Sequence, residues 1–231
     1  MSLKQKVLAT FVALLVVFAG GVWAGYRIDR GNDPQDNIKT VFTPYEDGIA
    51  NYLAFLDKAQ RSVLIADYSF TDPRIVDKLI ELKTGRKQVD IHLLLDLSQT
   101  QGRSGEHEQA QIERLRAAGI EVVIGTAEKA HAIMHDKYTV IDGEWVESGS
   151  WNYTKSANDQ ANVQDYIRSK TRAKLFSDNW QRMYRFMKAQ ESQRSADKAS
   201  AEDDNEDGDG PVQPAPKAPE HRKSPSRHAP R

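Results

Sequence analysis

The strongest constraint on the fold is an alternation of short apolar runs with longer segments of helical character. Four apolar runs each have the length of one buried strand, and they cover residues 38–42, 62–66, 89–95 and 120–124. Three segments with helical signals lie between them, at residues 45–60, 73–84 and 104–118. Strands that alternate with helices of this length are typical of βαβ units, so the pattern predicts a largely parallel sheet.

The pattern changes in the second half of the domain. Three further extended runs follow, at residues 135–141, 145–150 and 163–167. The dipeptide Asp142-Gly143 joins the first two, and Asp-Gly between strand-like runs is a strong signal for a β-hairpin. Residues 171–190 then carry aromatic and apolar side chains at helical spacing. We therefore expect an α/β domain over residues 38–191, with a mixed β-sheet between helical layers.

The N-terminus contains an uncharged run of 20 residues, 7–26, preceded by Lys4 and Lys6. As a helix it would be about 30 Å long, which matches the core of a bilayer. Residues 1–27 are therefore predicted to be an uncleaved membrane anchor, or a signal peptide that is cut after the small-residue site at 22–24. Either reading places the domain outside the cytoplasm, membrane-anchored through residues 7–26 or, after cleavage, periplasmic or secreted.

The domain is flanked by polar segments. Residues 28–37 form a polar linker. From Ser192 the apolar content falls, and an acidic run at 202–209 is followed by prolines and a basic end. Such a composition buries too little apolar surface to fold alone, so residues 192–231 are predicted to be disordered.

Composition excludes several classes of protein. The chain has no cysteine, which rules out a disulfide scaffold, a cysteine zinc site and a thiol nucleophile. The formal net charge of −1 rules out a generally basic nucleic-acid coat. Binding of a polyanion must then depend on local geometry.

Polar residues with reactive groups gather in the predicted hairpin. His135 and Lys137 share one strand face because they are two residues apart, and Ser150 and Asn152 share a face of the second strand. If the hairpin pairs, the four groups can converge to attack phosphorus and to bind the phosphate oxygens. The set lacks the carboxylates that a divalent metal needs, so no metal and no cofactor is expected. His131 lies four residues before His135, as in helical zinc sites, but the alternating residues around His135 favour a strand.

This stretch resembles the signature of the phospholipase D superfamily, in which His-x-Lys is followed after four residues by Asp and after six more by Gly-Ser. The matching positions are His135, Lys137, Asp142, Gly149 and Ser150. Asn152 matches the asparagine that usually follows, and residues 66–73 resemble an early strand–loop of the short single-motif endonucleases. The resemblance covers roughly residues 38–190.

The resemblance implies phosphodiester hydrolysis through a phosphohistidine, without a metal. It assigns His135, Lys137 and Asp142 to the catalytic motif, and Ser150 and Asn152 to substrate binding. Strand alternation places Asp142 opposite His135, so a turn or scaffold role suits it better than acid catalysis.

The single copy of the motif implies a homodimer in which two chains share one active site. The implied substrate is DNA or RNA, cleaved by an exported or membrane-anchored endonuclease; the alternatives are a membrane phospholipid such as cardiolipin, or a degenerate phosphate-binding module. Five cations can form a rim that binds a polyanion: Lys155, Arg168, Lys170, Arg172 and Lys174. Surface cations of this kind are more often simply solvated.

One position departs from the pattern of the short members. They carry a Glu-Asn pair after the Gly-Ser element, and its glutamate orients the catalytic histidine. Here Asn162 is present, but Ala161 occupies the glutamate position. Asp159, Gln160 or Gln164 can replace it if its side chain reaches the imidazole, because orientation needs only an acceptor.

Overall fold

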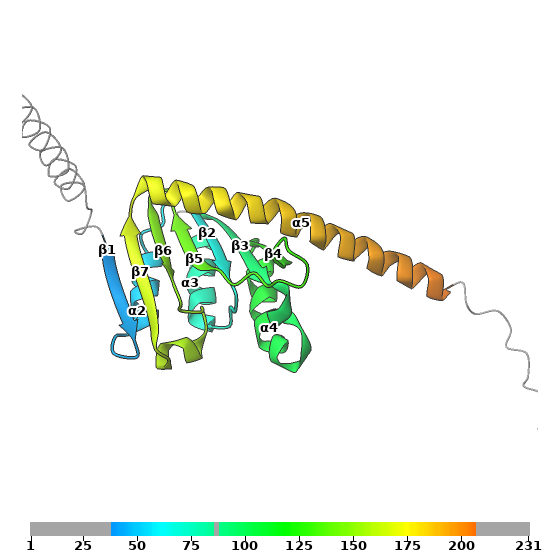
Figure 1. Cartoon of the computed structure of the whole chain (residues 1–231), viewed down its shortest axis with the longest axis horizontal. Helices are drawn as coiled ribbons and strands as arrows, with labels where there is room; N and C mark the ends of the chain where they lie inside the picture. The colour runs from blue at the N-terminus through cyan, green and yellow to red at the C-terminus, as the bar shows by residue number, and fades with distance from the viewer. Residues whose placement is uncertain (1–37, 86–87, 207–231) are drawn as a thin grey trace, which may run out of the picture. The chain divides into compact units, whose positions relative to one another are not determined.

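The computed structural model describes residues 38–206 apart from 86 and 87 (Figure 1). The predicted anchor or signal peptide at 1–27 and the whole of the predicted linker at 28–37 lie outside these residues. Among the described helices, none is long and apolar enough to span a bilayer. The chain divides into a compact unit that ends at Glu191 and a second unit that begins at Ser192.

One mixed sheet of seven strands forms the centre of the first unit, in the order β1-β7-β6-β5-β2-β3-β4. The strands are β1 (Ile38–Thr43), β2 (Ser62–Asp67), β3 (Asp90–Asp96), β4 (Glu121–Gly125), β5 (Lys137–Ile141), β6 (Trp145–Gly149) and β7 (Asn162–Arg168). The pairs β2–β3 and β3–β4 are parallel, and the other four are antiparallel. The mixed sheet is confirmed, but parallel pairing is restricted to three strands because the hairpin, β7 and β1 add antiparallel neighbours.

The predicted hairpin is confirmed at its turn. Asp142 and Gly143 have φ values of 56° and 66°, and two consecutive left-handed residues give the turn that matches the twist of paired strands. Thr139 pairs with Glu147, and Tyr138 pairs with Ser148. This register fixes which side chains of β5 and β6 share a face.

Helices cover both faces of the sheet, as Figure 1 shows. The helices are α2 (Gly48–Leu56), α3 (Pro73–Thr84), α4 (Gly102–Ala117) and α5 (Lys170–Glu206), with 3-10 turns η2 (Leu97–Thr100) and η3 (Lys155–Asp159). One apolar core joins the sheet to α2, α3 and α4, and its members include Tyr52, Ile75 and Ile112. A second core on the other face contains Trp180 and Met187 of α5. The predicted arrangement of a sheet between helical layers is therefore confirmed.

The expected disorder from Ser192 is wrong for the first part of that segment, because α5 remains helical to Glu206. This stretch is rich in Ala, Gln, Glu, Lys and Arg, which are strong helix formers. Extending an existing helix also needs no new nucleus, so low apolar content does not prevent it. Residues 207–231 lie outside the described part of the chain.

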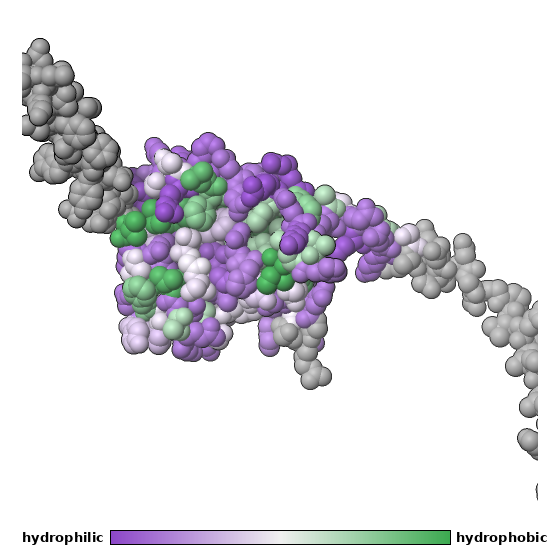
Figure 2. All heavy atoms as spheres, in the orientation of Figure 1, coloured by the Kyte–Doolittle hydropathy of each residue, from purple (hydrophilic) through white to green (hydrophobic). Residues whose placement is uncertain are grey.

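The face of the domain drawn in Figure 2 is mostly hydrophilic, with apolar side chains in separate patches. The large apolar side chains that remain exposed are Ile38, Phe42, Tyr45, Ile133 and Leu175. Phe42 lies near the end of β1 and Tyr45 lies just after it, where β1 pairs with the start of β7. They therefore border the region in which the candidate site lies.

Candidate active site

His135 and Lys137 lie at the start of β5. Lys137 is the first residue of the strand and is 8% exposed, whereas His135 precedes the strand and is exposed. The Lys137 ammonium donates a hydrogen bond of 2.9 Å to the His135 carbonyl oxygen. This contact fixes a cation directly beneath the histidine backbone, and the imidazole faces solvent.

Tyr68 lies against both residues of the motif. Its ring centroid is 4.6 Å from that of His135, and the Lys137 Nζ lies 5.0 Å from the same tyrosine ring. The Tyr68 hydroxyl accepts a hydrogen bond of 2.7 Å from Gln99 in η2. Tyr68 was not among the predicted site residues, because its only signal in the sequence is an aromatic side chain directly after the buried strand β2.

A buried carboxyl group lies beside Lys137. Asp67 pairs with Lys137 across β2 and β5, and its Oδ2 accepts a bond from the Tyr153 backbone N–H at 3.3 Å. Burial raises the pKa of the Asp67 carboxyl well above its usual value, against the opposing effects of that N–H and of Lys137. Burial lowers the pKa of the Lys137 ammonium, and Asp67 opposes that shift. Each of the two groups therefore favours the charged form of the other, whereas burial disfavours the charged form of both.

Ser150 is held by β7. Its Oγ donates to the Asn162 Oδ1 at 3.0 Å and accepts from the Val163 N–H at 3.1 Å. The preceding Gly149 approaches β7 so closely that a Cβ would lie 2.0 Å from the Val163 carbonyl oxygen. Only glycine fits there, which explains the Gly-Ser pair physically. Asn152 is partly buried, and its Oδ1 has no hydrogen-bond partner within the described part of the chain.

Strand alternation does not bring the four polar groups together as expected. Because Ser148 pairs with Tyr138, alternation alone would place Ser150 and Asn152 on the face opposite Lys137. The strand β6 ends at Gly149, however, and the chain turns toward η3, so alternation no longer applies. Direct contacts join His135, Lys137 and Tyr68 in one group, and Ser150 with β7 in another.

Asp142 is a structural residue. Its carboxylate accepts hydrogen bonds of 2.8 to 3.0 Å from the backbone N–H groups of Gln60, Arg61 and Ser62. It follows the last residue of β5, whereas His135 precedes the first, so the length of this strand, about 13 Å from Lys137 to Ile141, lies between them. These bonds agree with the scaffold role suggested by its position in the strand alternation, and its assignment to the catalytic motif stays a prediction.

A hollow of about 560 Å³ lies beside Ser150 and Asn162, and Ala161 contributes to its wall. Gln164 is fully buried, and a Cβ on Gly48 would lie 2.7 Å from its Oε1, so its amide points toward the start of α2. Asp159 and Gln160 are exposed at the end of η3. The carboxylate in this hollow is instead Glu46, whose Oε2 accepts from the Phe42 N–H at 3.0 Å.

Most of the cations proposed for a polyanion-binding rim lie elsewhere. Lys155 is the first residue of η3, three residues after Asn152 of the candidate site. Arg168 ends β7, about 20 Å along the strand from Asn162, and Lys170, Arg172 and Lys174 continue into α5. In the described residues, no group of three or more His, Asp or Glu side chains can hold a metal ion.

Comparisons with known proteins place the chain in one family. The chain matches the family model for the PLD-like domain of cardiolipin synthase over residues 52–184. It is 30% identical over 151 residues to a phospholipase D of Rickettsia prowazekii, covering 63% of this chain and 67% of that protein. It is 32% identical over 109 residues to a mitochondrial cardiolipin hydrolase of Chlamydomonas reinhardtii, covering 47% of this chain and 44% of that one.

Solved structures show the same relationship. Nuc of Salmonella typhimurium, a phospholipase D family member, superposes with a TM-score of 0.57 at 26% identity, covering 64% of this chain and 93% of Nuc. NucT of Helicobacter pylori superposes equally well, with a TM-score of 0.57, at 22% identity, covering 64% of this chain and 95% of NucT.

The fold and the His-x-Lys site are those of a phosphodiester-hydrolysing class of α/β enzymes. The chain belongs to the phospholipase D superfamily and resembles its short endonucleases.

Proposed function

We propose that this protein is a metal-independent phosphodiesterase that cleaves DNA or RNA at a site shared by two copies of the chain. The observation that carries the proposal is the exposed His135 ring above the fixed ammonium of Lys137. A histidine exposed in this way can reach an internal phosphate of a long polymer. The buried lysine adjacent to it neutralises charge that a metal would otherwise neutralise.

The reaction proceeds in two displacements. A ring nitrogen of His135 attacks phosphorus and forms a P–N bond, while the P–O bond to the leaving group breaks. The partner subunit's His135 protonates the leaving oxygen on the opposite side of phosphorus and then takes a proton from the water that hydrolyses the phosphohistidine. Lys137 binds the non-bridging oxygens, together with Ser150 and Asn152.

A second copy of the chain is required by the geometry of the displacement. The attacking ring nitrogen and the leaving oxygen lie in line on opposite sides of phosphorus, so one imidazole cannot attack phosphorus and protonate the leaving oxygen at once. Neither ring nitrogen of His135 is hydrogen-bonded to another of the described residues, so the ring is free to act. A two-fold axis near His135 would bring the two rings to one phosphate.

Nucleic acid is the favoured substrate because the chain resembles the short endonucleases of the superfamily. The superposition on Nuc, a short member, covers almost the whole length of that protein. Phospholipid is the second candidate, favoured by the names of the curated relatives, which include a phospholipase D and a cardiolipin hydrolase. The apolar run at 7–26 suits either substrate, since we propose that it anchors the domain outside the cytoplasm. A non-catalytic phosphate-binding role is disfavoured by the intact pair His135 and Lys137.

The test uses the full-length chain in detergent with excess EDTA. Plasmid DNA, single-stranded RNA and mixed micelles containing cardiolipin are offered separately, and strand breaks or released phosphatidic acid are measured. We expect nicking that is lost in His135→Ala and kept in His107→Ala, a control at an exposed histidine of α4. Phosphatidic acid without nicking would establish the second candidate. Activity that returns only on adding magnesium would refute the metal-free mechanism.

A further inference from the structure

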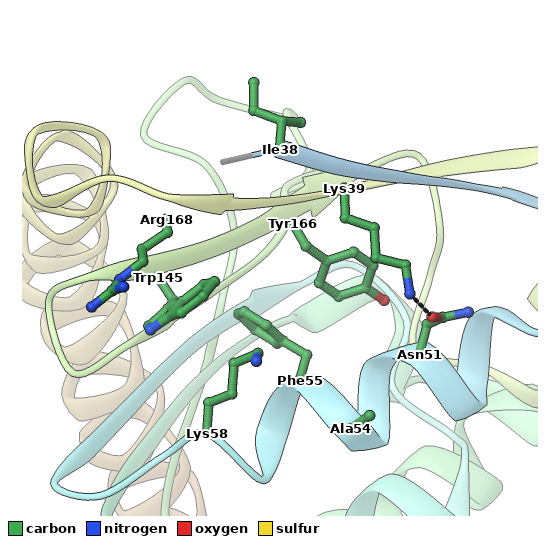
Figure 3. A pocket seen from close by; sticks show the side chains of 9 residues that line it. All are labelled: Ile38, Lys39, Asn51, Ala54, Phe55, Lys58, Trp145, Tyr166 and Arg168. Atoms are coloured by element: carbon green, nitrogen blue, oxygen red, sulfur yellow. Dashed lines mark hydrogen bonds between the residues drawn. The ribbon is translucent and has the colours of Figure 1, made fainter. Parts of the chain in front are cut away.

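A second cavity of about 390 Å³ lies at the opposite end of the sheet from His135 (Figure 3). Its walls come from the start of β1, the start of β6, the end of β7 and the face of α2. This volume is within the range of small-molecule sites. Asn162 and Arg168 are at opposite ends of β7, so about 20 Å separates this cavity from the Ser150 group.

The floor of the cavity is aromatic and contains an unsatisfied hydroxyl. The rings of Phe55 and Tyr166 have centroids 5.2 Å apart, and Tyr166 is only 6% exposed. The Tyr166 hydroxyl has no hydrogen-bond partner within the described residues. In Figure 3 it points along the wall toward Lys39 and Asn51. A buried hydroxyl without a partner is unfavourable, so an acceptor atom of a ligand would stabilise it.

The rim of the cavity is cationic. Trp145 lies between two cations, with the Lys58 Nζ 4.7 Å and the Arg168 guanidinium 5.3 Å from its ring centroid. Lys39 adds a third cation and donates to the Asn51 side chain. These contacts hold the three charges around one opening.

The positive charge at this rim is only partly neutralised. Arg168 forms an ion pair with Glu144 at 2.6 Å, but neither Lys39 nor Lys58 forms one with any described residue. No carboxylate is among the residues that line the cavity. Lys39 and Lys58 line the same cavity, so an anionic ligand inside it would be attracted to both ammonium groups.

We propose that this cavity binds an organic phosphate. Its phosphate group would lie at the rim formed by Lys39, Lys58 and Arg168, and its carbon skeleton would lie on Phe55 with a polar atom at the Tyr166 hydroxyl. Oxygen anions of this kind match both the lysine ammonium and the guanidinium donors. This site is independent of the proposed hydrolysis and needs no residue of the His135 group.

Two sources supply such a ligand. One is a soluble phosphate ester, such as a nucleoside monophosphate or glycerol phosphate. The other is the headgroup of an anionic lipid. The cavity opens beside Ile38, which 11 residues separate from the apolar run that ends at Tyr26. If that run is retained in a bilayer, extended chain of this length keeps the rim within about 40 Å of the membrane surface.

The test measures binding by the full-length chain in neutral detergent micelles. Calorimetry and the ligand-induced rise in Tm are recorded with AMP, with glycerol 3-phosphate, and with micelles that do or do not contain phosphatidic acid. The variants are Lys58→Gln/Arg168→Gln and Tyr166→Phe. The control is Lys83→Gln/Arg185→Gln, which also replaces one lysine and one arginine and makes the same change in charge away from the cavity.

We expect at least one probe to bind, with affinity about tenfold weaker in the rim variant and unchanged in the control. Tyr166→Phe should leave the free protein no less stable, because the hydroxyl has no partner, yet should reduce the rise in Tm on binding. Binding of AMP or glycerol 3-phosphate alone identifies a soluble ligand, and a response to phosphatidic acid alone identifies a lipid headgroup. Absence of binding at millimolar concentration, or equal binding by the rim variant and its control, would overturn the proposal.

Discussion

The ring of Tyr68 lies against the ring of His135, with centroids 4.6 Å apart at an angle of 53°. The same tyrosine ring also lies 5.0 Å from the Lys137 ammonium. The hydrogen bond from Lys137 to the His135 carbonyl oxygen positions the lysine side chain but not the imidazole. Tyr68 contacts both side chains and therefore fixes their relative positions. An exposed imidazole would otherwise sample several rotamers, and misplacement of a nucleophile by about 1 Å can lower the rate about 10²-fold.

We expect Tyr68→Ala to lower kcat by about 10- to 100-fold, while Tyr68→Phe stays within about threefold of the wild type because the ring is kept. The measurement is steady-state hydrolysis of the preferred substrate, with Tm as a check on folding. A merely structural role would lower Tm in Tyr68→Ala with little loss of kcat per folded molecule, and that result would contradict the positioning role.

A second prediction concerns a buried chain of hydroxyl groups beneath the sheet. The Tyr153 hydroxyl donates to Glu147 Oε2 at 2.5 Å and contacts the Thr139 hydroxyl at 2.7 Å, which in turn contacts the Tyr52 hydroxyl at 2.6 Å. Burial raises the pKa of Glu147 from 4.5 to about 8, although its bond with Tyr153 opposes the shift. The native state therefore holds a proton here that the unfolded chain releases.

Between pH 4.5 and about 8 the native state binds more protons at Glu147 than the unfolded state does. Its contribution to stability is complete below pH 4.5 and is lost as the pH rises through that window, with a slope of about 1.4 kcal/mol per pH unit. Glu147→Gln keeps the acceptor for Tyr153 but removes this proton. Urea unfolding at pH 6 and pH 8 should give a smaller decrease for the variant, and equal decreases would contradict the assignment.

The elements of the fold could be predicted where one local signal dominates. Pro73 at a helix start and Asp142-Gly143 at a turn act within a few residues, and both lie where expected. The first helix was predicted too long: Asp47 caps it through the Ala50 N–H, and it ends at Leu56 rather than at Gln60.

The site could be predicted less completely because its contacts cross between elements. The motif gives His135 and Lys137, but Tyr68 and Asp67 reach them only because β2 pairs with β5, and no local pattern specifies that pairing. Glu46 likewise faces the hollow beside Ala161 because β1 pairs with β7 at the edge of the sheet. Strand alternation failed for Ser150 because β6 ends one residue before it.

The segment after Glu191 should be dispensable for the stability of the first unit. Trp180 donates from its indole N–H to the Ile65 carbonyl at 2.8 Å, and Met187 is buried in the second core, so these core residues of α5 lie before this point. Removal of residues 192–231 is expected to shift Tm by about 2 °C or less. Truncation after Asn179 removes both core residues and should prevent folding. A marked loss of Tm in the shorter deletion would show that the segment stabilises the domain.

The last prediction follows from the shared site. Each chain provides one His135, so a dimer of one wild-type and one His135→Ala chain has only one of the two imidazoles that the in-line reaction needs. The two chains are co-refolded at a ratio of one wild-type chain to three variants, and activity is expressed per wild-type chain. Random pairing leaves a wild-type chain with a wild-type partner in about one quarter of cases, so activity should fall to about one quarter.

The same excess of His107→Ala should cause no such fall, because its chains retain His135. Sedimentation should show a dimer in every mixture. If activity per wild-type chain is unchanged and the active species sediments as a monomer, the second proton donor must lie within one chain, and His131 is the first residue to test.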